Sequence, residues 1–140
     1  MESTVNWLGE SGMSFSAVVG SGHTVLMDGA PEAGGHNSAP RPMELLLAGM
    51  GGCTAFDVVM ILKKARQAIH GCEVKLNAKR AETDPKVFTH IHLDFIVTGK
   101  DLDSARVTKA VELSHDKYCS ATIMLAKTAE ITYSIQVIEG

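Results

Sequence analysis

Lysine and arginine are absent from the first forty residues of this chain, whose first basic residue is Arg41. A secretory signal needs a basic segment ahead of its apolar one, and a transit peptide is rich in arginine. We therefore expect a cytoplasmic protein without a targeting segment. The net charge of −3 gives no electrostatic reason to expect a nucleic acid partner.

Cysteines are also few. The chain has three of them, Cys53, Cys72 and Cys119, and no two stand at C-x-x-C spacing. An odd number argues against a disulfide scaffold and for a reducing compartment. The spacing gives no support for a zinc ribbon or a thioredoxin motif. We expect no cofactor and no resident metal.

One apolar run, residues 45–62, is long enough to cross a membrane. It contains Asp57 and three glycines, and no comparable run occurs elsewhere in the sequence. A charged residue is costly at the centre of a bilayer. We therefore interpret this run as a buried helix of a soluble protein with no membrane partner.

The order of the predicted elements indicates an α+β fold in a single domain, residues 1–140. Alternating apolar residues and turn sequences predict three N-terminal strands, a hairpin through Asp84-Pro85 and a last strand. A long apolar helix begins at Pro42 and stops at Gly71. The strands cover residues 4–9, 13–19, 23–28, 72–82, 87–99 and 130–138, and two shorter helices cover 103–115 and 119–128. The order is therefore βββ-α-ββ-αα-β, with strands grouped rather than alternating with helices.

The long helix is apolar nearly all round, so most of its surface must be covered. Six strands of modest length from one subunit cover only part of it. This predicts a homodimer in which two central helices pack together. Glycines at positions 49, 51 and 52 weaken the helix near its middle, so we also expect a kink or a break there.

Cys53 follows two of these glycines, at a place where the backbone is expected to restart a helix. A cysteine at a helix N-terminus feels the positive end of the helix dipole, which favours the thiolate. The alternative is a small buried thiol, which is common in apolar helices. The pattern around Cys53 alone leaves both open.

Cys119 lies in the segment SHDKYCSATIML, at the junction of two predicted helices. His115 and Lys117 are near it in sequence, and both would favour a thiolate, although packing is again the simpler account. Two thiols, each near a helix start, suit a two-step redox cycle. One becomes a sulfenic acid and the other condenses with it to a disulfide. Cys72 heads a strand on its inward face and is interpreted as a core residue.

His90, His92 and Asp94 project from one face of one predicted strand, where they could bind a metal ion. The alternative is a solvated strand face opposite lysines of the hairpin, and no third region clearly supplies further ligands. We favour the solvated face. Asp57, on the apolar helix, must find a partner or a wet pocket, because an unpaired buried carboxylate is costly.

Three segments of the chain resemble the OsmC/Ohr family, and most closely its YhfA-like branch. They are SAPRPMELLLAGMGGCTAFDVVMILKKAR, HIHLDFIVTG and LSHDKYCSATIMLAK, and the resemblance extends over nearly the whole sequence. It implies an OsmC-like α+β fold, an intertwined homodimer in which antiparallel sheets are wrapped around two central apolar helices.

The resemblance also implies an activity. The best-known members are thiol-dependent peroxidases that reduce organic hydroperoxides with dithiols as electron donors. By this likeness Cys53 is the peroxidatic cysteine and Cys119 the resolving one. The organic hydroperoxide and the dithiol reductant are then the expected small-molecule partners, and defence against oxidative stress is the expected role.

The chain departs from the family pattern at one place. Peroxidase members set an arginine from the N-terminal strands against the reactive thiolate, held by a glutamate directly after the helix-starting proline. Here those strands lack arginine, and Glu44 stands one position later than that glutamate. We predict that Arg41, held by Glu44, replaces the missing arginine. The alternative is a non-enzymatic dimer that binds a small apolar or reactive ligand in the interdimer pocket.

Overall fold

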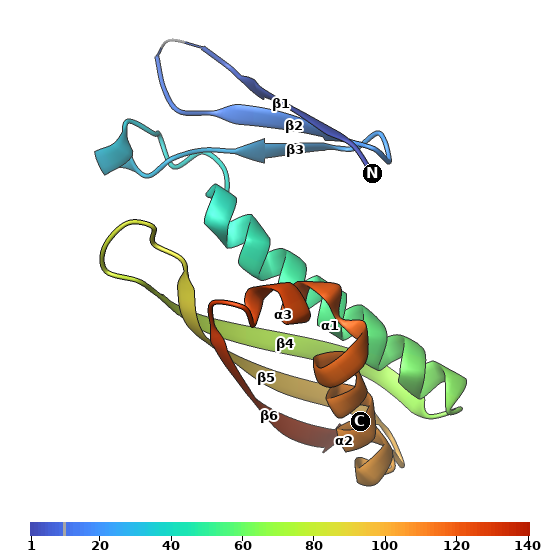
Figure 1. The fold of residues 1–140 in the computed structure, drawn as a ribbon. Coiled ribbons are helices and arrows are strands. Elements are labelled where there is room, and N and C mark those ends of the chain that lie inside the picture. Colours follow the sequence, from blue (N-terminus) through green and yellow to red (C-terminus); the bar gives the residue numbers. More distant parts are fainter. Residues whose placement is uncertain (10) are drawn as a thin grey trace. The chain divides into compact units, whose positions relative to one another are not determined.

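The computed structural model describes residues 1–9 and 11–140, and these form two compact units, Met1–Leu47 and Ala48–Gly140. The predicted order of elements is confirmed (Figure 1). The fold is a mixed α+β arrangement with two three-stranded sheets. The single domain expected over residues 1–140 stays a prediction.

The N-terminal unit is an antiparallel meander of three strands, β1 (Ser3–Trp7), β2 (Phe15–Val19) and β3 (Thr24–Met27). The predicted meander is therefore confirmed. Its strands are short, and large apolar side chains remain exposed in the chain, among them Val5, Trp7, Val18 and Leu26. Such a sheet has an apolar surface that is still free to be covered.

A buried carboxylate organises the loop that follows β3. Asp28 is 1% exposed and accepts hydrogen bonds from Gly29 N (2.7 Å), His36 N (3.1 Å), Ser38 N (3.0 Å) and Ser38 Oγ (2.6 Å). The Ser38 hydroxyl and N–H, followed by the N–H groups of Gly29 and His36, hold the pKa of Asp28 far below its usual range. The loop is therefore anchored at three points, Gly29, His36 and Ser38.

The long helix α1 (Pro42–Lys64) is continuous, so the predicted break at the glycines is wrong. Glycine costs a helix only about 1 kcal/mol, which tertiary packing can offset. The predicted end at Gly71 is also wrong. Arg66 adopts a left-handed conformation (φ 57°), and Gln67 N donates to Leu62 O at 2.9 Å. This pair of features is typical of a Schellman-type helix end, here achieved without glycine.

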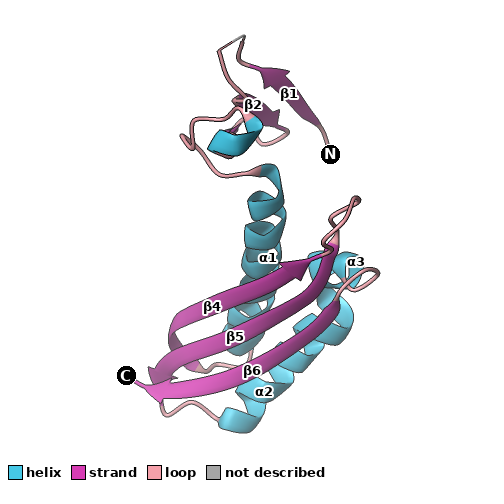
Figure 2. Cartoon of the chain, turned by 90° about the vertical axis from the view of Figure 1, so that its left-hand side faces the viewer, coloured by secondary structure: helices cyan, strands magenta, loops and turns pink. Residues whose placement is uncertain are grey.

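The C-terminal unit contains the sheet β4 (Ala68–Arg80), β5 (Phe88–Lys100) and β6 (Glu130–Glu139). β4 and β5 form the predicted antiparallel hairpin, but β6 runs parallel to β5, so the fully antiparallel sheet was wrong. The reason is the connection between β5 and β6. It contains α2 (Ser104–Leu113), a π-helical turn (Ser114–Tyr118) and α3 (Ser120–Leu125), which make a crossover possible. Figure 2 shows these helices on one face of the sheet.

One stripe of α1 packs into the core of this unit. Its buried members are spaced four residues apart, namely Met50, Thr54, Val58 and Leu62. The buried face of β5 and the buried stripe of α2 complete the core, with Ile91, Leu93, Phe95, Val97, Val107, Ala110 and Val111. A side chain at Gly51 would meet Leu76 of β4, because a Cβ atom there would lie 2.7 Å from Leu76 Cδ1. Gly51 therefore permits a close approach of helix and sheet.

The opposite face of α1 is not covered within the C-terminal unit. Phe56 is 65% exposed and Met60 36% exposed. Among residues 1–9 and 11–140, α1 is also the one helix whose length and composition would suit a membrane span, a property that core helices of soluble proteins share. Within this unit, the covering on most sides that was expected from the sequence is thus incomplete.

The Asp28 cluster makes the stability of the N-terminal unit depend on pH. Its carboxyl pKa is lower in the folded than in the unfolded chain, so its contribution is full above the unfolded value of about 4 and is lost as pH falls below it. We expect Asp28→Asn to weaken protection of the 29–38 amides at neutral pH and to flatten its loss in acid. Hydrogen exchange followed by mass spectrometry measures both. Equal acid dependence in the two proteins would contradict this account.

Candidate functional site

The structure brings Cys53 and Cys119 together within the C-terminal unit. Cys53 is half-buried on α1, and Cys119 is fully buried at the start of α3. Burial is the largest cause that raises the pKa of the Cys119 thiol, and the adjacent Cys53 thiol raises it further. The two residues that the sequence paired are neighbours, one open to solvent and the other shielded from it.

Cys119 takes the place of a helix cap. Its backbone is extended (φ −75°, ψ 99°), and its Sγ accepts from Thr122 N at 3.4 Å and from Thr122 Oγ1 at 3.1 Å. Serine or threonine commonly fills this position, and here the sulfur performs the same function. Both bonds lower the pKa of Cys119, against the larger effect of burial. The predicted junction of two helical segments is confirmed.

The cations that the sequence set near Cys119 contact other groups. The His115 ring packs edge-on against Tyr133, with centroids 5.1 Å apart, and Lys117 Nζ lies 5.2 Å from the Tyr118 ring centroid. Neither residue contributes to the pKa of Cys119, which burial raises rather than lowers. The expectation that they favour a Cys119 thiolate is therefore wrong.

The helix-dipole argument for Cys53 is wrong for a related reason. Cys53 is the twelfth residue of a continuous helix, about three turns from its first residue. The field of a helix terminus falls off within the first turn. A charged group from another element must therefore supply any positive field that Cys53 needs.

Ser114 is the site residue that the sequence analysis missed. Its hydroxyl donates to Asp57 Oδ2 at 2.9 Å and lies 2.8 Å from Thr54 Oγ1. Asp57 thus has the partner that the sequence required of it. Ser114 and Thr54 are buried, and both sides of this contact lie close in sequence to a cysteine. No spacing signal could have found it, because the contact depends on the π-helical turn after α2.

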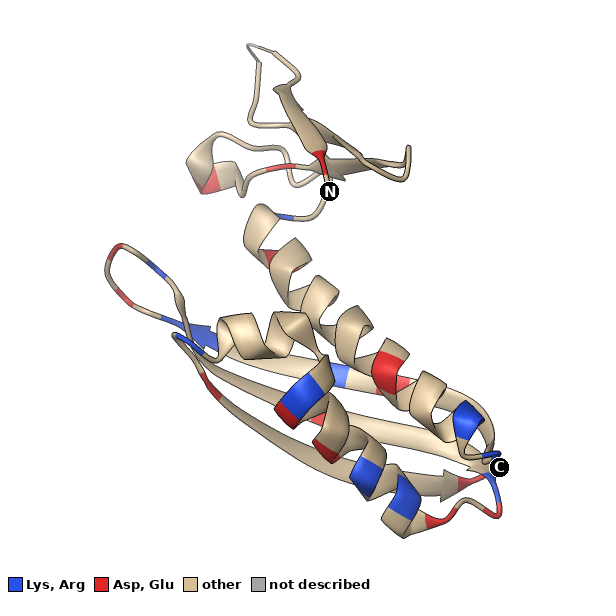
Figure 3. Ribbon diagram, turned by 45° about the vertical axis from the view of Figure 1, so that its right-hand side comes forward, with Lys and Arg blue, Asp and Glu red and all other residues tan. Residues whose placement is uncertain are grey.

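The predicted contact between Arg41 and Glu44 is present in the N-terminal unit. Arg41 Nη1 lies 3.4 Å from Glu44 Oε1 and donates to Asn37 Oδ1 at 3.1 Å. The Glu44 carboxylate also accepts the Arg41 backbone N–H at 2.9 Å. That bond is the main cause that lowers the pKa of Glu44, and the Arg41 guanidinium adds to it. Residues 1–47 contain no other lysine or arginine (Figure 3).

The other candidate residues, Cys72, His92 and Asp94, lie outside the Cys53–Cys119 pair. Cys72 is half-buried rather than part of the core, and burial raises the pKa of its thiol. His92 lies between Asp94 Oδ1 (3.1 Å) and Thr132 Oγ1 (2.6 Å), while Ser134 donates to Asp94. Within residues 1–9 and 11–140, no group of three or more His, Cys, Asp or Glu side chains is arranged to hold a metal ion.

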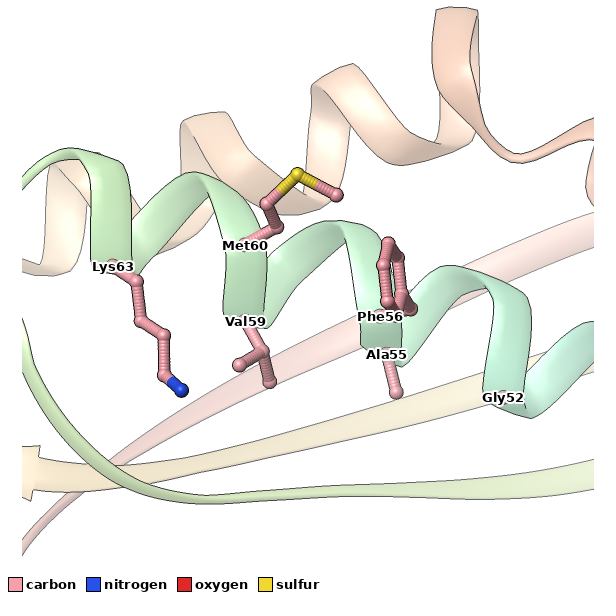
Figure 4. A pocket seen from close by; sticks show the side chains of 6 residues that line it. All are labelled: Gly52, Ala55, Phe56, Val59, Met60 and Lys63. Atoms are coloured by element: carbon pink, nitrogen blue, oxygen red, sulfur yellow. The ribbon is translucent and has the colours of Figure 1, made fainter.

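Two of the hollows that border α1 are relevant to function. One, of about 320 Å³, is mainly apolar and is lined by Asp57, Met60, Ile61, Lys64, Leu113 and Tyr118. The other, of about 550 Å³, is a shallow depression on the uncovered face of α1 (Figure 4). Its walls are Gly52, Ala55, Phe56, Val59, Met60 and Lys63.

Comparisons with known proteins support the family and the fold. The sequence model of the family described as OsmC-like protein matches residues 35–134. The chain is 49% identical to Protein YhfA of Escherichia coli over 99% of its length and 98% of the relative. A structural-genomics structure, 46% identical over 100% of both chains, superposes with a TM-score of 0.89. The organic hydroperoxide resistance protein OhrB of Bacillus subtilis, 19% identical, covers 97% of this chain and 98% of its own, with a TM-score of 0.60.

Substitution of Thr122 tests whether its hydroxyl group lowers the pKa of the Cys119 thiol. Thr122→Val removes the hydroxyl donor to Sγ, so the pKa of Cys119 should rise further, whereas Thr122→Ser keeps the donor and should not raise it. The thiolate absorbance is titrated in a chain whose other cysteines are replaced by serine. Coincident curves for Val and Ser would show that this hydroxyl does not act on the thiol.

Proposed function

This chain belongs to the OsmC-like protein family, and from that premise we propose that it is a cytoplasmic thiol-dependent peroxidase that reduces organic hydroperoxides. The observation that carries the proposal is the pairing of a half-buried Cys53 with a fully buried Cys119. In this proposal solvent and substrate reach the Cys53 thiol, and the Cys119 thiol lies beside it, shielded from both. The likeness to hydroperoxide resistance proteins supports the same reaction class.

The first step is attack by the Cys53 thiolate on an oxygen of the hydroperoxide. The thiolate takes the hydroxyl oxygen, the O–O bond breaks, and Cys53 becomes a sulfenic acid, while the alkoxide leaves as the alcohol after it takes a proton from water. Burial raises the pKa of Cys119, so its thiol keeps its proton at this stage and can donate to the Cys53 sulfur. The two roles follow from this difference in exposure.

The second step joins the thiols. Cys119 attacks the sulfur of the sulfenic acid, the S–O bond breaks, and water leaves with the Cys119 proton. A dithiol then reduces the Cys53–Cys119 disulfide by two thiol–disulfide exchanges and is itself oxidised. No metal or organic cofactor enters this cycle.

We assign the positive field at Cys53 to Arg41, held by Glu44. Cys53 lies eleven residues beyond Pro42, which is about 16 Å along a continuous helix and farther than an arginine side chain extends. In our proposal Arg41 of the partner subunit therefore serves Cys53. This gives the loop anchored by Asp28 a role, since Asn37 of that loop accepts from Arg41.

A homodimer is part of the proposal. The uncovered face of α1 carries the large side chains of Phe56 and Met60 (Figure 4). On the same face Gly52 has no side chain, and nothing lies within 4 Å of where its Cβ atom would be, which leaves room for a second helix. Apolar residues of the N-terminal sheet are exposed as well. Both surfaces lose their contact with water when two chains pair.

The second candidate function is non-enzymatic binding of a small apolar ligand. It is favoured by the hollow of about 320 Å³ that Met60, Ile61, Leu113 and Tyr118 line. A binding protein keeps its affinity when Cys53 is replaced, whereas a peroxidase loses its reaction.

Hydroperoxide consumption in the presence of a dithiol tests the main proposal. Cys53→Ser should reduce turnover of tert-butyl hydroperoxide by about 10²-fold or more. Cys119→Ser should still consume one equivalent and then stop. Cys72→Ser is the matched control and should retain activity. Wild-type turnover in Cys53→Ser, or a disulfide that contains Cys72, would reject the assignment.

Arg41 is tested by the pH dependence of Cys53 alkylation. If Arg41 supplies the positive field, Arg41→Ala should slow the reaction of Cys53 with iodoacetamide at neutral pH, because the positive charge that favours the thiolate is gone. Arg66→Ala removes a cation near the other end of α1 and serves as the control. Superimposable titration curves for wild type and Arg41→Ala would remove Arg41 from the site.

Mass in solution tests the dimer. We expect wild type at micromolar concentration to scatter light as a particle of about 30 kDa, twice the 14.9 kDa of one chain. Phe56→Asp places a charge on the uncovered face of α1 and should give the monomer mass. Thr108→Asp, on the exposed side of α2, should not. A monomeric wild type would contradict the proposal.

A further inference from the structure

We propose that Ser114 is a positioning residue that sets Cys119 against Cys53 for disulfide closure. The inference rests on the proposed redox pair and concerns its second step. Ser114 touches neither substrate nor sulfur in the proposed cycle, and it acts through the residues it holds.

The side chain of Ser114 is bonded to α1 on both sides. Asp57 is a carboxylate and can only accept, so Ser114 Oγ donates its proton to Asp57 Oδ2 at 2.9 Å. Thr54 Oγ1, 2.8 Å away, must then donate to Ser114 Oγ. Thr54 directly follows Cys53 in sequence, and Asp57 lies one helical turn beyond Cys53. These two hydrogen bonds therefore fix Ser114 to the turn of α1 that carries Cys53.

The backbone of Ser114 is bonded to the other cysteine. Its carbonyl accepts the N–H of Cys119 at 2.9 Å, closing the π-helical turn Ser114–Tyr118. Turns of this kind are rare and occur mostly at functional sites. One residue thus links α1 beside Cys53 to the main chain of Cys119. Ser114 is fully buried, so water cannot take the place of these bonds.

Disulfide closure needs this kind of control. A disulfide forms only within a narrow range of Cα and Cβ separations, so small displacements of one cysteine slow the reaction. Attack of the Cys53 thiolate on the peroxide needs no such alignment with Cys119. Removing the side-chain hydrogen bonds of Ser114 should therefore slow disulfide closure and leave the reaction of Cys53 with peroxide unchanged. General damage to the fold would alter both reactions.

The experiment measures closure without peroxide, so that it does not depend on the proposed substrate. In a Cys72→Ser chain, Cys53 is converted to a mixed disulfide with 5-thio-2-nitrobenzoate. Cys119 then attacks the Cys53 sulfur and expels the coloured thiolate, whose absorbance gives the rate. Ser114→Ala should slow this release by about ten- to hundredfold. The rate at which Cys53 takes up the label should stay as in wild type.

Matched variants separate positioning from stability. Ser134→Ala removes another serine hydroxyl that donates to an aspartate, Asp94, on the other face of the sheet, and should change neither rate. Asp57→Asn keeps an oxygen that accepts from Ser114 and should keep closure near the wild-type rate. If Ser114→Ala fails to fold, Thr54→Val, which removes one bond at constant shape, is expected to slow closure alone.

Wild-type closure in Ser114→Ala, or an equal slowing of labelling and closure, would overturn the positioning role. Failure of the proposed function looks different. In that case wild type forms no sulfenic acid with hydroperoxide, yet the release of the coloured thiolate still depends on Ser114.

Discussion

The packing of one stripe of α1 against the sheet β4–β5–β6 is the constraint on which the site depends. Met50, Thr54, Val58 and Leu62 are all buried, so α1 cannot rotate about its axis without exposing them. Full burial of a large aliphatic side chain contributes about 1.5–3 kcal/mol, which makes such a rotation costly. Cys53 precedes Thr54 and therefore lies at the edge of the stripe, half open to solvent. Gly51 sets how closely the helix approaches β4.

The same packing separates the environments of the two thiols. Cys119 lies within the crossover between β5 and β6, where burial favours its protonated form. Two hydrogen bonds from Thr122 partly oppose that effect. Two cysteines of equal intrinsic acidity thus acquire different properties from their positions alone, and a reaction with a fixed order of steps requires such a difference.

The apolar pattern predicted the order of elements, and the family likeness predicted the pairing of Cys53 with Cys119. These depend on periodicity or on family likeness, and both are present in the sequence. The unbroken course of α1 could not be predicted, because the glycines at 49, 51 and 52 read as a break until the sheet contact of Gly51 is known. The parallel pairing of β6 depends on how two short helices and a π-helical turn route the chain, which no local pattern encodes.

The site also depended on contacts between residues far apart in sequence. Ser114 and Thr54 are sixty residues apart, and neither residue type is distinctive at its position. No pattern in the sequence distinguishes Asp28 from other polar loop residues. In the structure it accepts four hydrogen bonds from the loop that follows it. The contact of Arg41 with Glu44 was predicted because the N-terminal strands contain no arginine and Arg41 is the first basic residue after them.

The parallel pairing of β5 and β6 has a consequence for folding. The hairpin β4–β5 is local and can form early, whereas the pairing of β6 with β5 closes a crossover over residues 101–129 and brings together residues far apart in sequence. Cys119 lies in that crossover, so its contact with Cys53 depends on a long-range closure rather than on local structure.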